Sequence, residues 1–399
     1  MKNQLSFPIF ALLLSLAACS TETPPPTTSP EKPTESITQP DEKPSTISTH
    51  VPAKWSALTG WLDDDLLPAW ETFLQSCTVL AKQPLWQETC SLAASIKQVN
   101  NSTLRNFFEA YFVPHQIIDN KGSDEGLITG YYEPLLQGSR TPSERFRFPL
   151  YSAPDELLVI DLSDIYPELK DLRLRGRLDG RKVVPYYSRG DIMNNPEKLS
   201  GHELVWVDNE VELFFLQIQG SGRIKLGDGE ILKVGYADQN GYPYNSIGRI
   251  LVEQDELPLE KASMQGIKQW GQQNPDKLNN LLQQNARYVF FRELPADLSG
   301  PIGALGVPLT AGRSIAIDPR SIPQGAPVFL ATTWPNTDKP LNRLMVAQDV
   351  GGAIKGGIRA DFFWGFGEEA GEQAGKMKQK VKMWVLMPQS YTSSQLARH

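Results

Sequence analysis

Histidine and cysteine, the side chains that most often hold metals or serve as nucleophiles, are scarce in this chain. Its 399 residues include 4 histidines and 3 cysteines. No histidine stands at metal-ligand spacing from another ligand, whether His50, His115, His202 or His399. Zinc sites need clustered ligands, so we expect no metal. Ser221, in "IQGSGR", lacks the flanking pattern of a nucleophile elbow, so a Ser-His-Asp triad is not indicated.

Excess positive charge and long apolar runs are lacking as well. The formal net charge is -7, which argues against a nucleic-acid partner, because polyphosphate backbones bind basic surfaces. No segment is long enough to cross a bilayer core of about 30 Å. The stretch "GFGEEA", residues 365–370, fits a loose dinucleotide fingerprint, but too little chain follows it to complete that fold. We therefore expect a turn into a short helix there, and no cofactor.

The first nineteen residues have the layout of an export signal. Lys2 supplies a positive start, the apolar run 7–18 follows, and small residues precede Cys19. The stretch "LAAC" resembles a bacterial lipobox, in which the cysteine is lipidated, and Ser20 behind it favours the outer membrane. We expect a signal over 1–19, a lipid on Cys19 and a place on the periplasmic face of the outer membrane. An ordinary signal with a chance cysteine is the alternative.

Residues 20–50 are rich in proline, serine and threonine and nearly free of apolar side chains. Such a segment cannot bury enough surface to fold. Proline keeps it extended, so it would reach roughly 90 Å at about 3 Å per residue. We interpret 20–50 as a disordered tether.

Two further cysteines, Cys77 and Cys90, are expected to meet an oxidising compartment after export. A disulfide between them is predicted on that ground. In the entropic account it would contribute about 3 kcal/mol to stability. Two buried free thiols are the alternative.

The remaining chain, about 350 residues, is long enough for two domains. Residues 55–116 repeat apolar residues at three- and four-residue spacing, which predicts helices. After Gly126, short β-branched and aromatic runs alternate with turn residues. They include "ELVWVDNEVELFFLQIQGSGRIKLGDGEILKVGYA", whose Asp-Gly step suits a hairpin. Numerous short strands favour a barrel or sandwich, and composition changes near 130 and 288 indicate a middle β unit inside an outer one.

Three aspartates follow apolar, strand-like runs in the last third of the chain: Asp318 in "SIAIDPR", Asp349 in "VAQDVGG" and Asp361 in "IRADFFWG". Each alone fits a turn aspartate, but the last two flank a glycine-rich loop that lets a ligand approach. Apolar neighbours and a second carboxylate raise an aspartate's pKa, which makes it a proton donor near neutral pH. We assign the acid to Asp361, with Asp349 and Asp318 tuning or positioning it. Without histidine, metal or cofactor, this chemistry suits sugars.

Longer motifs carry a family resemblance. "LTAGRSIAIDPRSIPQGAPVFL" and "AQDVGGAIKGGIRADFFWG" resemble the three-aspartate (3D) domain. "TGYYEPLLQGS" and "NARYVFFREL" resemble the middle domain of the membrane-bound lytic murein transglycosylase A family, and the similarity runs from about residue 55 to residue 388. It implies a double-psi β-barrel built from both ends of the chain, a smaller inserted β domain and a glycan groove between them.

With this resemblance, 51–130 is expected to be the helical first part of the large domain, 131–287 the inserted β domain, 288–390 the barrel part and 391–399 a tail. Motif positions give groove candidates in three places: near the hinge, along the inserted domain and between Asp349 and Asp361. They are Thr129, Tyr131, Tyr132, Gln219, Gly220, Ser221, Tyr236 and Lys355. Core packing of Tyr131 and Tyr236, and a solvated Lys355, are the alternatives.

The family's reaction is non-hydrolytic cleavage of the β-1,4 bond between N-acetylmuramic acid and N-acetylglucosamine, which leaves a 1,6-anhydromuramoyl end. The last of the three aspartates, here Asp361, is implied as the acid. The sugar's own 6-hydroxyl is the nucleophile, so no second carboxylate is needed. Peptidoglycan strands are the expected partner, with cell-wall synthesis proteins as further candidates. The rivals are a hydrolytic muramidase with Asp349 as base and a non-catalytic peptidoglycan-binding lipoprotein.

Overall fold

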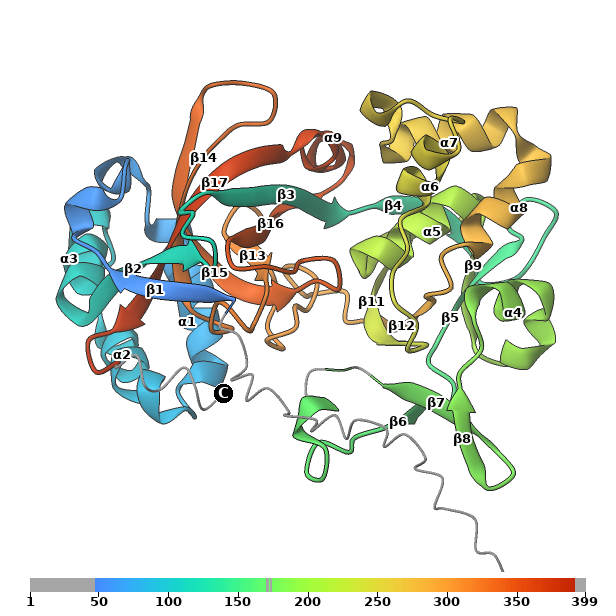
Figure 1. Cartoon of the computed structure of the whole chain (residues 1–399), viewed down its shortest axis with the longest axis horizontal. Coiled ribbons are helices and arrows are strands. Elements are labelled where there is room, and N and C mark those ends of the chain that lie inside the picture. The colour runs from blue at the N-terminus through green and yellow to red at the C-terminus, as the bar shows by residue number, and fades with distance from the viewer. Residues whose placement is uncertain (1–46, 170–171, 173, 392–399) are drawn as a thin grey trace, which may run out of the picture. The chain divides into compact units, whose positions relative to one another are not determined.

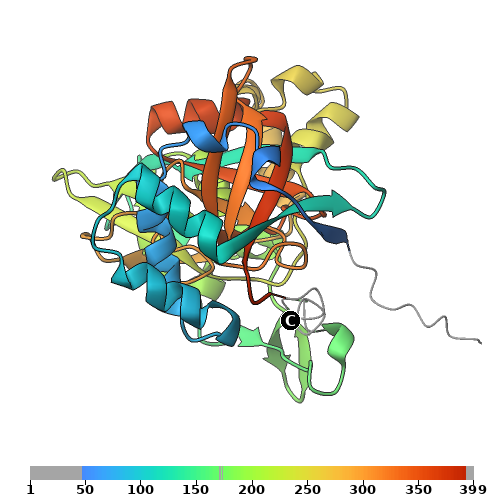
Figure 2. The ribbon, with the colours of Figure 1, turned by 90° about the vertical axis from the view of Figure 1, so that its left-hand side faces the viewer.

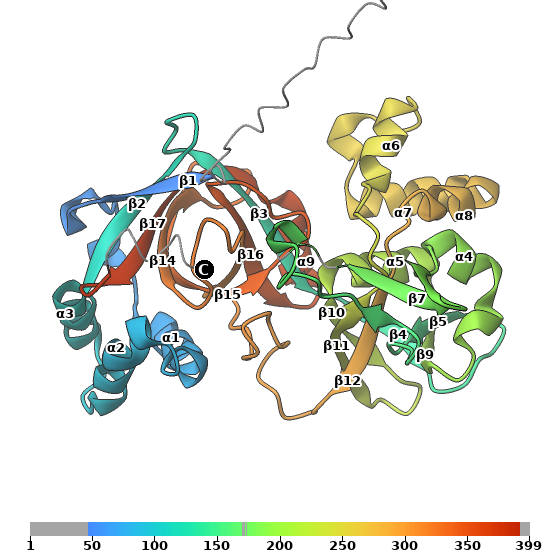
Figure 3. The ribbon, with the colours of Figure 1, turned by 60° about the horizontal axis from the view of Figure 1, so that its bottom comes forward.

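Six strands close into a barrel in the order β17–β14–β15–β13–β16–β3, with β3 pairing back to β17 (Figure 3). The computed structural model describes residues 47–169, 172 and 174–391. The barrel strands are β3 Gly126–Glu133, β13 Ser314–Ile317, β14 Pro327–Thr333, β15 Pro340–Val350, β16 Arg359–Phe366 and β17 Lys378–Pro388. The expected mainly β body with a barrel and a helical first part is confirmed.

Two further strands extend this sheet beyond β17. β1 (Ser48–Pro52) pairs antiparallel with β2 (Phe112–Asp119), and β2 pairs with β17. The tether expectation is therefore wrong for residues 48–50, because Ser48 is buried and its Oγ lies 2.6 Å from Ser321 Oγ. The expected signal, the lipidated Cys19 and the rest of the tether lie outside the described residues.

Three helices cover the outside of the barrel: α1 Leu67–Leu80, α2 Pro84–Ser95 and α3 Asn101–Tyr111. Figure 2 shows them, in blue and cyan, in front of the orange and red barrel strands. Their apolar faces join the barrel core through aromatic side chains such as Trp70 and Phe108. Cys77 of α1 and Cys90 of α2 form a disulfide with Cα atoms 5.3 Å apart. The helical expectation for residues 55–116 fails at its end, since Phe112 begins strand β2 and its backbone pairs with β17.

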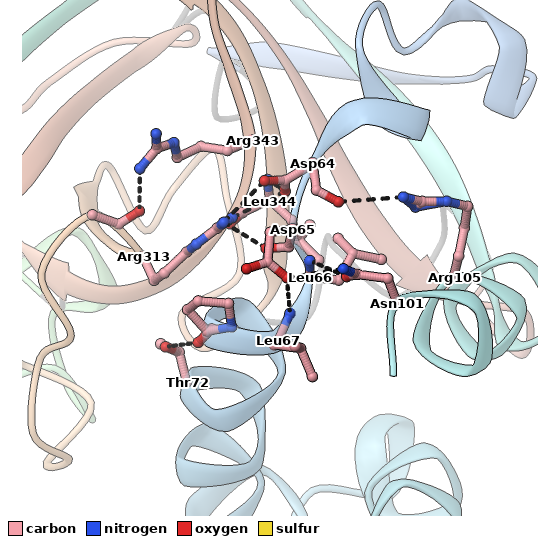
Figure 4. A network of polar contacts seen from close by, with 12 residues as sticks. Asp64, Asp65, Leu66, Leu67, Thr72, Asn101, Arg105, Arg313, Arg343 and Leu344 are labelled. Atoms are coloured by element: carbon pink, nitrogen blue, oxygen red, sulfur yellow. Dashed lines mark hydrogen bonds and ion pairs between the residues drawn. The ribbon is translucent and has the colours of Figure 1, made fainter. Parts of the chain in front are cut away.

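A buried ion pair fixes the start of the helical part against the barrel (Figure 4). Arg313 Nη1 and Nη2 donate to the two carboxylate oxygens of Asp64 at 3.0 and 2.9 Å. Leu344 N donates to Asp64 Oδ2 at 2.6 Å, and Arg313 Nη2 donates to the Asp65 carbonyl at 2.6 Å. Arg313 directly precedes β13, so this network holds that strand at its entry.

The chain between β3 and β13 builds a six-stranded sheet in the order β12–β11–β10–β4–β9–β5 and a three-stranded sheet β6–β7–β8. Figure 1 shows β3 leading directly into β4. The strands are β4 Leu135–Ser139, β5 Phe148–Tyr151, β6 Leu158–Val159, β7 Arg175–Asp179, β8 Lys182–Pro185, β9 Glu203–Val207, β10 Ser221–Lys225, β11 Ile231–Gln239 and β12 Val289–Leu294. The expected hairpin is present, since Leu226 N donates to the Glu230 carbonyl around Asp228-Gly229.

Five helices accompany these strands: α4 Arg189–Asn194, α5 Glu210–Gln219, α6 Ile247–Glu253, α7 Met264–Gln273 and α8 Pro275–Gln283. We expected strand over "LFFLQIQ", which is wrong, because Asn209 caps a helix there by accepting from Glu212 N. Apolar residues on three- and four-residue spacing, among them Val211 and Phe214, then face the core.

Both expected boundaries of the middle part fall inside sheets. β3 runs across residues 130 and 131, and β12, which lies beyond residue 288, pairs with β11 of the six-stranded sheet. The backbone pairing therefore moves the end of the middle part past 288. Helix α9 (Glu368–Lys376) follows Gly367, whose φ is 93°, so the expected turn into a short helix is confirmed.

Candidate active site

Strand register places two aspartates on either side of Ala316. Ala316 of β13 pairs with Asp349 of β15 on one side and with Asp361 of β16 on the other. Neighbouring strands lie about 4.8 Å apart and side chains at one level share a face. The two carboxylates are therefore separated by a single methyl group, across two strand spacings.

Asp361 accepts a hydrogen bond from a threonine on the next strand. Thr129 of β3 pairs in register with Asp361, and its Oγ1 donates to Asp361 Oδ1 at 2.5 Å. The same hydroxyl accepts from Arg359 Nη2 at 2.8 Å. An arginine thus acts on the aspartate through the threonine.

Burial raises the pKa of Asp361 to about 6, against lowering by the Thr129 hydrogen bond and the Arg359 charge and with further raising by Asp349. Burial dominates because a charged carboxylate loses most from leaving water. Asp361 therefore titrates near neutral pH and can hold a proton there. This is the setting that a general acid requires.

Asp349 is held as a hydrogen-bond acceptor on both oxygens. Tyr131 Oη donates to Asp349 Oδ2 at 3.0 Å, and the backbone N–H groups of Ala304 and Val350 donate to Oδ1 at 2.9 Å each. Burial, followed by the charges of Asp349 and Asp361, raises the pKa of Tyr131 well above its usual value. Tyr131 therefore stays protonated and acts as a hydrogen-bond donor to Asp349.

Asp318, at the end of β13, anchors the glycine-rich loop. It is fully buried and forms an ion pair with Arg320 at 2.7 Å. Burial raises its pKa, but hydrogen bonds from Arg320 and from the Gly356 N–H outweigh this, so the net shift is downward. The Gly356 N–H donates to Asp318 Oδ2 at 3.0 Å. Asp318 is thus a charged anchor of the loop that joins β15 to β16.

Asp349 and Asp361 open on a cavity of about 650 Å³ between the barrel and the six-stranded sheet. The barrel contributes Tyr131, Ala316 and both aspartates, and the chain returning to β13 contributes Pro301, Gly303, Ala304 and Leu309. The opposite wall comes from the end of α5, from β10 and from β11. Polar groups make up much of the lining, which suits a polar ligand.

The structure brings most of the residues chosen from sequence to this cavity. Tyr131, Gln219, Gly220, Ser221, Tyr236, Asp349 and Asp361 line it. Thr129 contacts it through Asp361. Tyr132 instead packs beneath α9 and donates to Met264 Sδ at 3.7 Å. Lys355 is exposed, and neither it nor Asp318 lines the cavity.

Sequence reasoning missed Arg359 and the arginines of the cavity wall. Arg359 lies two residues before Asp361, and strand alternation, which puts such residues on one face, was a usable signal. Arg175, Arg287 and Arg292 also line the cavity. No motif marks them, because they come from separate elements. Among the described residues, no cluster of three or more His, Cys, Asp or Glu could hold a metal ion.

A barrel that presents one protonatable carboxylate to a large polar cavity has the equipment of an acid–base enzyme. The model of the MltA specific insert domain matches residues 127–292, and that of the 3D domain matches 313–387. Membrane-bound lytic murein transglycosylase A of Escherichia coli K12 is 34% identical over 275 residues, which cover 67% of each chain. The chain belongs to the membrane-bound lytic murein transglycosylase A family and is an enzyme of that family.

Solved structures agree with this assignment. MltA from Neisseria gonorrhoeae is 40% identical, with a TM-score of 0.75, over 86% of this chain and 94% of that one. E. coli MltA with bound chitohexaose is 26% identical, with a TM-score of 0.61, over 85% and 91% of the two chains. No helix among the described residues is both long and apolar enough to span a membrane.

Proposed function

We propose that this chain cleaves the β-1,4 bond between N-acetylmuramic acid and N-acetylglucosamine in peptidoglycan and leaves a 1,6-anhydromuramoyl end. Protonated Asp361 gives its proton to the glycosidic oxygen as the bond from that oxygen to the muramoyl C1 breaks. The 6-hydroxyl oxygen of the same sugar bonds to C1, and its proton passes to the Asp361 carboxylate. Water is not consumed, and the acid ends the cycle protonated.

The observation that carries this proposal is that Asp361 is the carboxylate with a raised pKa at the cavity while Asp349 is engaged on both oxygens. A hydrolase would need a second carboxylate as nucleophile or as a base for water. Three donors already occupy Asp349, which leaves it poorly placed for either task. An intramolecular 6-hydroxyl has a high effective concentration and needs no such partner.

The substrate assignment draws on family names and on a relative's ligand. The E. coli relative binds chitohexaose, a β-1,4 saccharide. A cavity of about 650 Å³ has room for sugar units. We infer that peptidoglycan glycan strands fill it, and that the molecule follows the family layout of a double-psi barrel with an inserted domain. Parallel pairings β13–β15 and β16–β3 among antiparallel neighbours are consistent with such a barrel.

Anchoring is proposed from the sequence. A lipid on Cys19 would hold the enzyme at the outer membrane, and the Pro/Ser/Thr-rich segment would let the folded part reach the peptidoglycan layer. Replacing Cys19 with alanine should release the protein into the soluble periplasmic fraction.

Product analysis tests the reaction. Purified peptidoglycan is digested with the wild type and with Asp361→Asn, and the masses of the soluble fragments are determined by mass spectrometry. We expect anhydro ends from the wild type, and loss of at least 100-fold in rate from the variant, about the usual contribution of a general acid. Glycan binding by the variant should persist.

Three other results would change the assignment. Reducing ends carrying one added water would show a muramidase, with Asp349 as the base. Binding of peptidoglycan by the wild type without any release of fragments would show a binding lipoprotein instead. Substantial activity in Asp361→Asn would show that another group is the acid.

A further inference from the structure

The cavity wall opposite the barrel carries positive charge. Arg175, Arg287 and Arg292 line it, with one acidic residue from the same wall, Asp238. Arg175 Nε donates to Asp238 Oδ1 and Oδ2 at 2.9 and 3.0 Å, so these two charges compensate each other. Arg287 and Arg292 add two further positive charges to the cavity, although the whole chain has a formal net charge of -7.

Arg292 is exposed at the cavity. It follows Phe291 in β12, at the point where that strand changes from buried to exposed residues. Within the part of the chain that the structure describes, its side chain has neither an ion-pair nor a hydrogen-bond partner. Its guanidinium, with five donors in a planar fork, is therefore available to a ligand, and carboxylates match that geometry.

Arg287 reaches the other side of the cavity. Its guanidinium lies so close to Gly352 that any side chain at that position would collide with it. Gly352 stands three residues after Asp349, in the loop that leads to β16. Arg287 therefore places a positive charge beside the loop that joins β15 to β16, whereas Arg292 places one on the cavity wall opposite the barrel.

Two cations at the cavity, one beside the loop and one on the wall, would attract a negatively charged strand. A muramoyl residue carries a lactyl group on O3, which ends in a carboxylate or continues into a peptide with carboxylates of its own. A strand of N-acetylglucosamine alone carries no charge. Building on the proposed function, the geometry points to Arg287 and Arg292 as the residues by which this cavity selects carboxylate-bearing muramoyl strands over neutral ones.

Binding by the full-length protein, in an Asp361→Asn background that prevents turnover, tests this selection. Three ligands of similar length are compared: peptide-bearing strands, strands stripped of peptide by an amidase, and chitohexaose. Arg292→Gln should lower affinity for the charged strands relative to chitohexaose by about 5-fold. Salt should weaken binding of charged strands more in the parent protein than in this variant, because screening acts on the interaction that Arg292 makes.

Arg181→Gln is the matched control, because Arg181 is an exposed arginine in the β7–β8 turn that does not line the cavity. It should leave the ratio of affinities unchanged. Arg287→Lys, which keeps the charge, should retain more of the preference than Arg287→Gln. A change confined to peptide-bearing strands assigns the carboxylate to the peptide. A change confined to stripped strands assigns it to the lactyl group, whose carboxyl is an amide wherever a peptide is attached. An equal change in both means that the arginines accept either carboxylate.

An unchanged ratio in both Arg292→Gln and Arg287→Gln would overturn the inference and leave the anhydro-product test untouched. Conversely, if the wild type formed no anhydro ends while the ratio still fell in Arg292→Gln, the proposed reaction would fail and the charge selection would stand.

Discussion

The pKa of Asp361 is set by opposing effects of burial and of a few neighbouring residues. Burial raises its pKa, the Thr129 hydroxyl and the Arg359 charge lower it, and Asp349 raises it again. With a pKa of about 6, roughly a tenth of the carboxyl groups are protonated at pH 7. A bound strand that excludes water would raise that fraction, because desolvation disfavours the charged form.

The pH dependence of catalysis follows from this balance. In the proposed mechanism protonated Asp361 is the acid, so kcat/KM should fall as pH rises through about 6. Thr129→Val removes a hydrogen bond that favours the carboxylate, so the descending limb should move about one pH unit upward. The pH profile of kcat/KM checks this.

Thr78→Val is the control, since Thr78 is an exposed threonine whose hydroxyl donates to the Gln75 carbonyl of its own helix. Its profile should match the wild type. A descending limb that stays in place in Thr129→Val, or moves downward because Arg359 approaches Asp361, would show that the Thr129 hydroxyl does not lower the pKa of Asp361.

From the sequence we predicted Asp361 as the acid and chose several residues that line the cavity, because motif and composition are local features. The run "DFFWG" by itself indicates an apolar setting for Asp361. What Thr129 does was not predictable in the same way, since it depends on the parallel pairing of two strands 232 residues apart. The anchoring role of Asp318 likewise depends on its contact with Gly356, 38 positions away, which only the fold provides.

At the scale of elements, the pairing register of the barrel strands places the two aspartates at the same level of the sheet. β13 lies between β15 and β16, and Ala316 occupies the level that both aspartates share. Ala316 is 3% exposed, yet it lines the cavity. A small residue here keeps the space between the two carboxylates open. Apolar runs predicted the strands, but not which strands are neighbours, because pairing is decided by long-range packing.

Ala316→Val should obstruct that space. Two added methyl groups would fill the floor of the cavity, and we expect kcat/KM to fall roughly 10-fold or more, since small misplacements of a reacting group are costly. Overpacking should also cost about 1–3 kcal/mol of unfolding free energy. Steady-state kinetics and denaturant unfolding measure the two effects separately.

Ala347→Val serves as the matched control. Ala347 is a fully buried alanine of β15 that belongs to the core and does not line the cavity. It should lose similar stability and keep most activity at a temperature where it is folded. Equal losses of activity in the two variants would mean that general barrel distortion, rather than the space at Ala316, matters.

At the scale of the whole molecule, residues far apart in sequence assemble the site. The helical first part contacts the barrel through Asp64 and Arg313, which are 249 positions apart. The helices themselves were predictable from periodicity, whereas this contact and the helix α5 in a run that resembled a strand were not. The contact depends on long-range packing. In α5 the aromatic run concealed the local helix signals, which are the Asn209 cap and apolar residues spaced to bury one face against α6 and α7.

Breaking the buried pair should be costly, because the remaining charge loses its partner. Asp64→Leu leaves Arg313 buried without a carboxylate, and we expect a loss of about 3–5 kcal/mol. The double variant Asp64→Leu/Arg313→Met removes both charges and leaves only neutral backbone groups unpaired, at about 1–3 kcal/mol each. The double variant should therefore be no less stable than Asp64→Leu alone. Urea unfolding of the single and double variants measures the difference.

Glu372→Gln provides the comparison with a surface pair, because Glu372 and Lys376 of α9 are both exposed and lie one helical turn apart. Its cost should stay below about 1 kcal/mol. Because Asp64 does not line the cavity, the folded fraction of each Asp64 variant should keep near-normal kcat/KM. A large activity loss without a stability loss would instead show that this network positions Ala316 at the site through β13.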